Sequence, residues 1–243
     1  INPYYDIAME LSRFEYTYDL SGFIKSEVAT SDKTVVTNLY IYDSRAQLIS
    51  NATTTKYNGE ITEATETTYT YDNAGNRLTS VKKSGNDLLC NVTYVYNGNN
   101  QVTDIFGSCD DNDNKDKHVV LSYDANGNPL SYYNGSQYTF TWKDGRRLAT
   151  ASALGGYLSM SYSYNADGIR VSKNVNDVRH EYYLDGSRII KETWADQTLE
   201  FLYDENNSVY CIVYTGGDGA GRYYLIKNLQ GDVTRILNNN LKP

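Results

Sequence analysis

Histidine is the side chain that most readily exchanges a proton near neutral pH, and this chain has two, His118 and His180. His118 follows an acidic segment, and His180 precedes Glu181 at the expected start of a strand. Neither histidine has a serine or cysteine beside it in sequence that it could activate as a nucleophile. We therefore interpret both as exposed, solvated side chains and predict no catalytic residue.

Residues 110–116 (DDNDNKD) carry the oxygen ligands that calcium prefers. An EF-hand loop that began at Asp110 would need glycine at its sixth position and glutamate at its twelfth. Lys115 and Leu121 stand there instead. A solvated acidic loop is the favoured interpretation and a calcium site near Asp111 the alternative, so we predict no metal or cofactor.

A glycine-rich segment, residues 216–221 (GGDGAG), resembles a nucleotide-binding loop only superficially. No Gly-Lys-Ser/Thr sequence follows it, and no helix-forming stretch comes after it to present an N-terminus to a phosphate. This segment is predicted to be a flexible turn.

Three cysteines, Cys90, Cys109 and Cys211, cannot all pair within one chain, and no CxxC pair is present. Isolated thiols that pack as small hydrophobic side chains are the favoured interpretation. A Cys90–Cys109 disulfide is the alternative.

Aromatic side chains offer a possible sugar-stacking surface, because Trp142, Trp194 and many tyrosines are present. The chain has 25 Tyr but only 5 Phe and 2 Trp, and tyrosine favours β-strands. Since the aromatic residues recur at regular positions, a packed ladder along a sheet is favoured over a sugar platform.

The charge balance restricts the partners. The 22 Lys and Arg residues are outnumbered by 30 Asp and Glu residues, a net charge of −8. Neutralising phosphates requires clustered basic residues, so we predict no nucleic-acid partner. No apolar run approaches the ~20 residues of a membrane-spanning helix, and we predict no membrane span.

Internal repeats determine the expected architecture. The fullest copies are residues 69–78 (YTYDNAGNRL), 121–130 (LSYDANGNPL) and 162–171 (YSYNADGIRV). We call the second aromatic residue of each copy its marker. The clear markers stand at positions 18, 42, 71, 96, 123, 142, 164 and 203, and Tyr183 fills the one long gap.

Each copy predicts one β-hairpin. Tyr69 and Tyr71 alternate with polar residues and share one face of a strand. Residues 72–76 (DNAGN) form a turn, since Asp and Asn bind their own backbone and Gly accepts positive φ. We predict an all-β fold of stacked antiparallel hairpins that form one continuous curved or spiralling sheet with little helix. The repeat tyrosines are expected to be largely buried.

The residues predicted to shape the repeats are the markers and the turn residues after them. They are Tyr18, Asp19, Tyr42, Asp43, Tyr71, Asp72, Gly75, Tyr96, Tyr123, Asp124, Gly127, Trp142, Gly145, Tyr164, Gly168, Tyr203, Asp204 and Gly231.

The pattern Y-x-Y-D-x-x-G resembles the YD (RHS) repeat family, and residues 140–148 (FTWKDGRRL) resemble its tryptophan variant. Residues 223–233 (YYLIKNLQGDV) resemble the start of the RHS-associated core. On this basis we expect a lead-in over residues 1–15, a repeat array over 16–222 and a truncated core-like segment over 223–243. Asn97 and Asn165 depart from the pattern in place of Asp, and Ala46 does so in place of Gly.

The resemblance implies a hollow β-shell that encloses or presents another domain, in secreted or cell-surface proteins of the toxin or wall-associated type. We therefore expect a non-enzymatic structural fragment, with a carbohydrate or cell-surface binding module as the alternative. Its expected partners are other repeats or domains of the parent chain, or cell-surface glycans. Weak self-association is expected through open sheet edges near Tyr16 or Tyr224.

Overall fold

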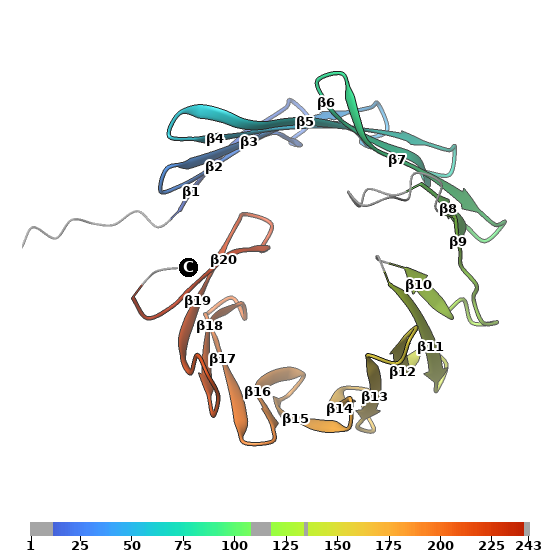
Figure 1. Cartoon of the computed structure of the whole chain (residues 1–243), viewed down its shortest axis with the longest axis vertical. Coiled ribbons are helices and arrows are strands. Elements are labelled where there is room, and N and C mark those ends of the chain that lie inside the picture. The colour runs from blue at the N-terminus through green and yellow to red at the C-terminus, as the bar shows by residue number, and fades with distance from the viewer. Residues whose placement is uncertain (1–11, 108–117, 134–135, 241–243) are drawn as a thin grey trace, which may run out of the picture. The chain divides into compact units, whose positions relative to one another are not determined.

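In the computed structural model, which describes residues 12–107, 118–133 and 136–240, every regular element is a β-strand (Figure 1). The chain divides into two units, Ile1–Val120 and Leu121–Pro243, each built on one antiparallel sheet. The first sheet contains β1 (Arg13–Tyr18), β2 (Ile24–Ser31), β3 (Thr34–Tyr42), β4 (Leu48–Tyr57), β5 (Glu60–Tyr71), β6 (Arg77–Ser84), β7 (Asp87–Tyr96), β8 (Val102–Phe106) and β9 (His118–Val120). The second contains β10 (Ser131–Tyr133), β11 (Gln137–Lys143), β12 (Arg147–Ala153), β13 (Ser159–Tyr164), β14 (Arg170–Val175), β15 (Val178–Asp185), β16 (Arg188–Trp194), β17 (Gln197–Tyr203), β18 (Val209–Thr215), β19 (Gly221–Lys227) and β20 (Val233–Leu237).

The predicted all-β class of consecutive antiparallel hairpins is confirmed, because the strands of both sheets follow sequence order. The expected single sheet is instead two sheets, of nine and eleven strands. The regular pairing stops in the copy at residues 121–130, where Tyr123 and Pro129 form an isolated bridge and the Leu130 amide donates to the Ser122 carbonyl at 2.8 Å. Proline has no amide hydrogen, so Pro129 donates no backbone hydrogen bond to the opposite strand.

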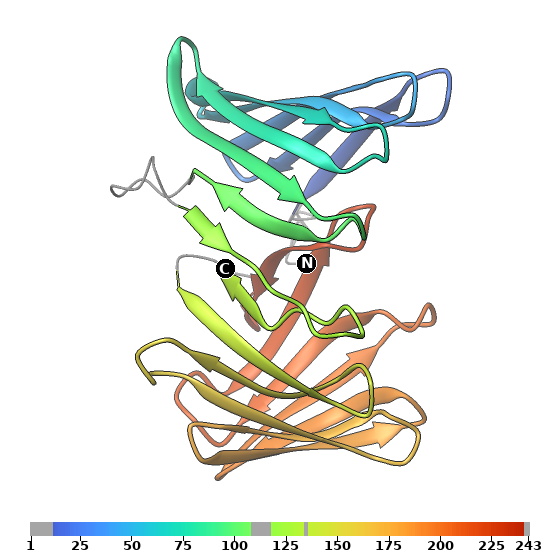
Figure 2. The ribbon, with the colours of Figure 1, turned by 90° about the vertical axis from the view of Figure 1, so that its right-hand side faces the viewer.

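Two kinds of turn link consecutive strands, at opposite ends of the strands in each sheet (Figure 2). One end carries the predicted Asp or Asn turns. The other end carries several two-residue turns, such as Asn58-Gly59, with φ of 51° and 86°, and Asn176-Asp177, with φ of 47° and 66°, and longer connections between β12 and β13 and between β18 and β19. Positive φ at both central residues defines the type I′ turn, whose twist matches that of the flanking strands. The second turn therefore connects one repeat to the next without disturbing the sheet.

A β-bulge recurs at the marker of the repeats. The register shifts between Thr70 and Tyr71 and between Ser163 and Tyr164, so the marker pairs with a residue one position closer to the turn than a regular register would give. A bulge bends its strand and increases the local twist. Its repetition accompanies the arc that the strands of the 11-stranded sheet follow (Figure 1).

The expectation that the repeat tyrosines are largely buried is wrong. Tyr18 is 51% exposed, and Tyr42, Tyr71, Tyr123 and Tyr164 are half-buried. Each unit is a single sheet, so a ring is covered only by neighbours on the same face. Within the described residues, few apolar side chains are buried, namely Cys90, Val92, Ala151, Ala153, Cys211 and Leu237.

Candidate functional site

The predicted turn aspartates close their turns by accepting backbone hydrogen bonds. Asp72 Oδ1 accepts from the Asn76 amide at 2.8 Å, and Asp124 Oδ1 accepts from the amides of Asn126 and Asn128 at 2.9 Å. The side-chain amide of Asn76 donates to Asp72 Oδ2, and that of Asn128 donates to Asp124 Oδ2, both at 2.8 Å. These hydrogen bonds favour the ionised form and lower the pKa of both carboxyl groups. Equivalent backbone bonds occur at Asp19, Asp43 and Asp204.

Asparagine performs the same task in the copies that lack aspartate. Asn97 Oδ1 accepts from the amides of Asn99 and Gln101, and Asn165 Oδ1 accepts from the Ile169 amide. The turn thus requires a side-chain oxygen at this position and no charge. Asn228 forms one more such turn, which the sequence analysis missed although the predicted Gly231 lies three residues after it.

The fourth residue of these turns adopts the left-handed conformation that favours glycine. The predicted Gly75, Gly127, Gly168 and Gly231 have φ between 81° and 91°. Ala46 occupies the same place with φ of 62°, so its side chain carries a steric cost that glycine avoids. The predicted Gly145 also has positive φ, but it belongs to the shorter turn between β11 and β12.

The marker aromatic residues bind the backbone of the preceding hairpin. The Tyr71 hydroxyl donates to the Leu48 carbonyl at 2.6 Å, and the Tyr164 hydroxyl donates to the Leu148 carbonyl at 2.9 Å. The same arrangement joins Tyr42 to Ile24, Tyr96 to Arg77, Trp142 to Pro129 and Tyr203 to Ile189. These six markers therefore connect successive repeats as well as covering part of the sheet.

The position of the Leu48 carbonyl explains why a side chain with a hydrogen-bond donor is favourable at the marker position. The pairing between β4 and β5 ends at the pair Ser50 and Thr68. Leu48 lies two residues before Ser50, next to the turn that precedes β4. Beyond that pair β4 and β5 no longer pair, so the Leu48 carbonyl has no pairing residue on β5 and accepts a hydrogen bond from the Tyr71 hydroxyl. A tyrosine or tryptophan suits this place because its ring packs on the sheet while its polar end donates.

The marker of the degenerate copy is Leu184, and the prediction of Tyr183 is wrong by one residue. The bulge lies between Tyr183 and Leu184, and Leu184 pairs with Ile189 as other markers pair with their return strands. Tyr183 is 44% exposed, and the ammonium group of Lys191 lies 4.2 Å from its ring centre. Sequence spacing alone does not locate the bulge.

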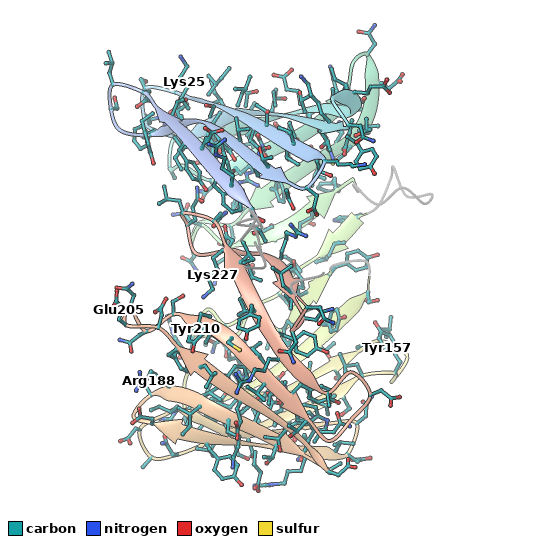
Figure 3. The ribbon with its side chains drawn as sticks, turned by 90° about the vertical axis from the view of Figure 1, so that its left-hand side faces the viewer. Lys25, Tyr157, Arg188, Glu205, Tyr210 and Lys227 are labelled. Atoms are coloured by element: carbon teal, nitrogen blue, oxygen red, sulfur yellow. The ribbon has the colours of Figure 1, made fainter. Side chains whose placement is uncertain are left out.

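The turn edge of the second sheet carries further links between neighbouring hairpins. Arg188 Nη1 donates to Asn207 Oδ1 at 2.8 Å, and Lys227 Nζ donates to Ser208 Oγ. Figure 3 shows Arg188, Glu205 and Lys227 along one edge of this sheet and Tyr157 at the opposite edge. Neighbouring repeats are thus joined at the turns and at the markers.

A cluster of titratable and aromatic side chains lies on β14, β15, β16 and β18. We call it the His180 cluster; it comprises Lys173, His180, Glu192, Trp194 and Tyr214. Glu192 Oε1 lies 2.7 Å from His180 Nδ1 and 3.0 Å from Lys173 Nζ. The side chains of His180 and Glu192 are only 14% and 11% exposed, so the expectation of a solvated His180 is wrong.

The electrostatics of the cluster favour a fixed arrangement. Burial lowers the pKa of Lys173, but the hydrogen bond to Glu192 and its charge outweigh burial and raise the pKa overall. Lys173 thus stays protonated at neutral pH. Glu192 Oε1 contacts both His180 and Lys173. This contact fixes the His180 ring against Trp194, with ring centres 5.0 Å apart.

Rings continue from the cluster across the sheet. Trp194 lies nearly parallel to Tyr214, with an interplanar angle of 8° and ring centres 6.2 Å apart. The Tyr214 hydroxyl donates to Gln197 Oε1 at 2.5 Å. Trp194 therefore belongs to a row of stacked rings, whereas Trp142 occupies a marker position.

The second histidine lies at the start of β9. His118 Nε2 is 2.7 Å from Asp104 Oδ1, and its ring stacks on Phe106 at 4.3 Å. The side chain is 46% exposed, in agreement with the expected exposure. The acidic segment at residues 110–116, with its calcium alternative, lies outside the described residues.

The expectation of isolated thiols is wrong for Cys90, which is disulfide-bonded to a partner outside the described residues. Cys211 is a free thiol and is buried. The glycine-rich residues 216–221 join β18 to β19. Within the described parts of the chain, no group of three or more His, Cys, Asp or Glu residues could hold a metal ion. The same described ranges contain no helix that is long and apolar enough to cross a membrane.

No family model matches this chain. The tRNA3(Ser)-specific nuclease WapA of Bacillus spizizenii is 31% identical over 172 residues, which are 69% of this chain and 7% of that protein. The tRNA nuclease WapA of Bacillus subtilis is 29% identical over 172 residues, with the same shares of the two chains. The chain thus spans 7% of the length of these curated relatives.

Among solved structures, the chain is similar to the TcdB2-TccC3-TEV crystal structure, with 12% sequence identity and a TM-score of 0.47. The match covers 96% of this chain and 14% of that one, and at this level it indicates no activity. The two sequence relatives do affect one expectation. Both are named nucleases, which contradicts the prediction that this chain is a non-enzymatic fragment.

Proposed function

We propose that this chain is a wall segment of a YD (RHS) repeat shell that encloses or presents the nuclease domain of a larger protein. The repeated bond from a marker to the preceding hairpin carries the proposal. It occurs at Tyr42, Tyr71, Tyr96, Trp142, Tyr164 and Tyr203. A device that joins each hairpin only to its neighbours can extend an array without limit.

The lengths of the relatives support a segment of a larger assembly. This chain corresponds to 7% of two proteins named tRNA nucleases. A repeat array within such a protein can serve as a wall only if its sheets are stiff. The links between neighbouring turns and the marker hydrogen bonds provide that stiffness. A secreted or cell-surface location fits the same proposal, because the Cys90 disulfide belongs to oxidising compartments.

The test uses the full-length protein that carries this chain. Residues 13–237 are deleted, and the rate at which a protease cleaves the nuclease domain is measured beside its activity on tRNA. A wall segment predicts that deletion exposes the domain, so that it is cleaved at least tenfold faster. The variant Tyr183→Phe serves as the control, since it leaves the marker bonds unchanged. Equal cleavage rates before and after deletion would overturn the proposal.

A further inference from the structure

We draw no further inference here: the strongest candidate, the buried carboxylate of Glu27 on β2 of the first sheet, is already engaged by the hydroxyls of Tyr16 and Tyr40 and the side-chain amide of Asn38, and no second observation in the described residues points to a ligand there.

Discussion

Removing one marker hydroxyl should measure how strongly a repeat holds its neighbour. Tyr71→Phe keeps the half-buried ring and deletes only the donor that lies 2.6 Å from the Leu48 carbonyl. A net intramolecular hydrogen bond contributes about 0.5–1.5 kcal/mol, and no cavity forms because the ring remains. We expect the free energy of unfolding to fall by about 1 kcal/mol. Tyr164→Phe should show a similar loss in the second unit, since its hydroxyl bond to Leu148 is equivalent.

Urea unfolding followed by circular dichroism provides the measurement, with the denaturant dependence compared between variants to confirm an unchanged transition. Tyr183→Phe is the control: the side chain is 44% exposed and stands outside the marker series, so a change within about 0.5 kcal/mol is expected. If both marker variants unfold at the wild-type midpoint, water replaces the lost hydroxyl without cost. The marker bonds would then contribute nothing to joining the repeats.

Substitutions at three further positions test the turns and one partly buried hydroxyl. Ala46→Gly should raise the free energy of unfolding by about 0.5–1 kcal/mol in urea, because φ of 62° is strained for alanine, and an unchanged or lower value would refute this. Asp72→Asn should unfold near the wild-type midpoint at pH 7, whereas Asp72→Ala should be clearly less stable. Because the pKa of Asp72 is lowered in the folded chain, its ionised carboxylate adds stability above the ordinary carboxyl pKa, and this stability is lost as the pH falls through the folded-state pKa. Asp72→Asn should therefore show a weaker dependence of stability on acid pH. Parallel stability profiles for the two proteins would contradict this. Burial and the charge of Glu27 raise the pKa of Tyr40 to about 12, so stability present below pH 10 should be lost between pH 10 and 12, and Tyr40→Phe should reduce that loss in urea titrations at these pH values.

The sequence was sufficient to predict the hairpins because their turns are local. Asp72 binds amides within four residues of itself, and Gly75 meets a conformational demand of its own backbone. Side-chain type and spacing express such interactions directly. The same reasoning explains why Asn97 and Asn165 can stand in place of aspartate, since the amide oxygen replaces the carboxylate oxygen.

The interruption of the sheet and the bulge depend on pairing that one strand cannot express alone. Pro129 was visible in its repeat, but only the pairing shows that this copy has an isolated bridge between Tyr123 and Pro129 in place of a regular ladder. Tyr183 was taken as a marker because it is aromatic and correctly spaced, yet the register places Leu184 there. A one-residue shift exchanges the two faces of a strand, so the identity of a marker depends on its partner strand.

The His180 cluster lay beyond sequence reasoning for a related reason. His180, Glu192 and Trp194 belong to two paired strands, and their separations in sequence carry no helical or strand period that points to a cluster. Only the register brings Trp194 opposite His180 and Leu199 opposite Glu192.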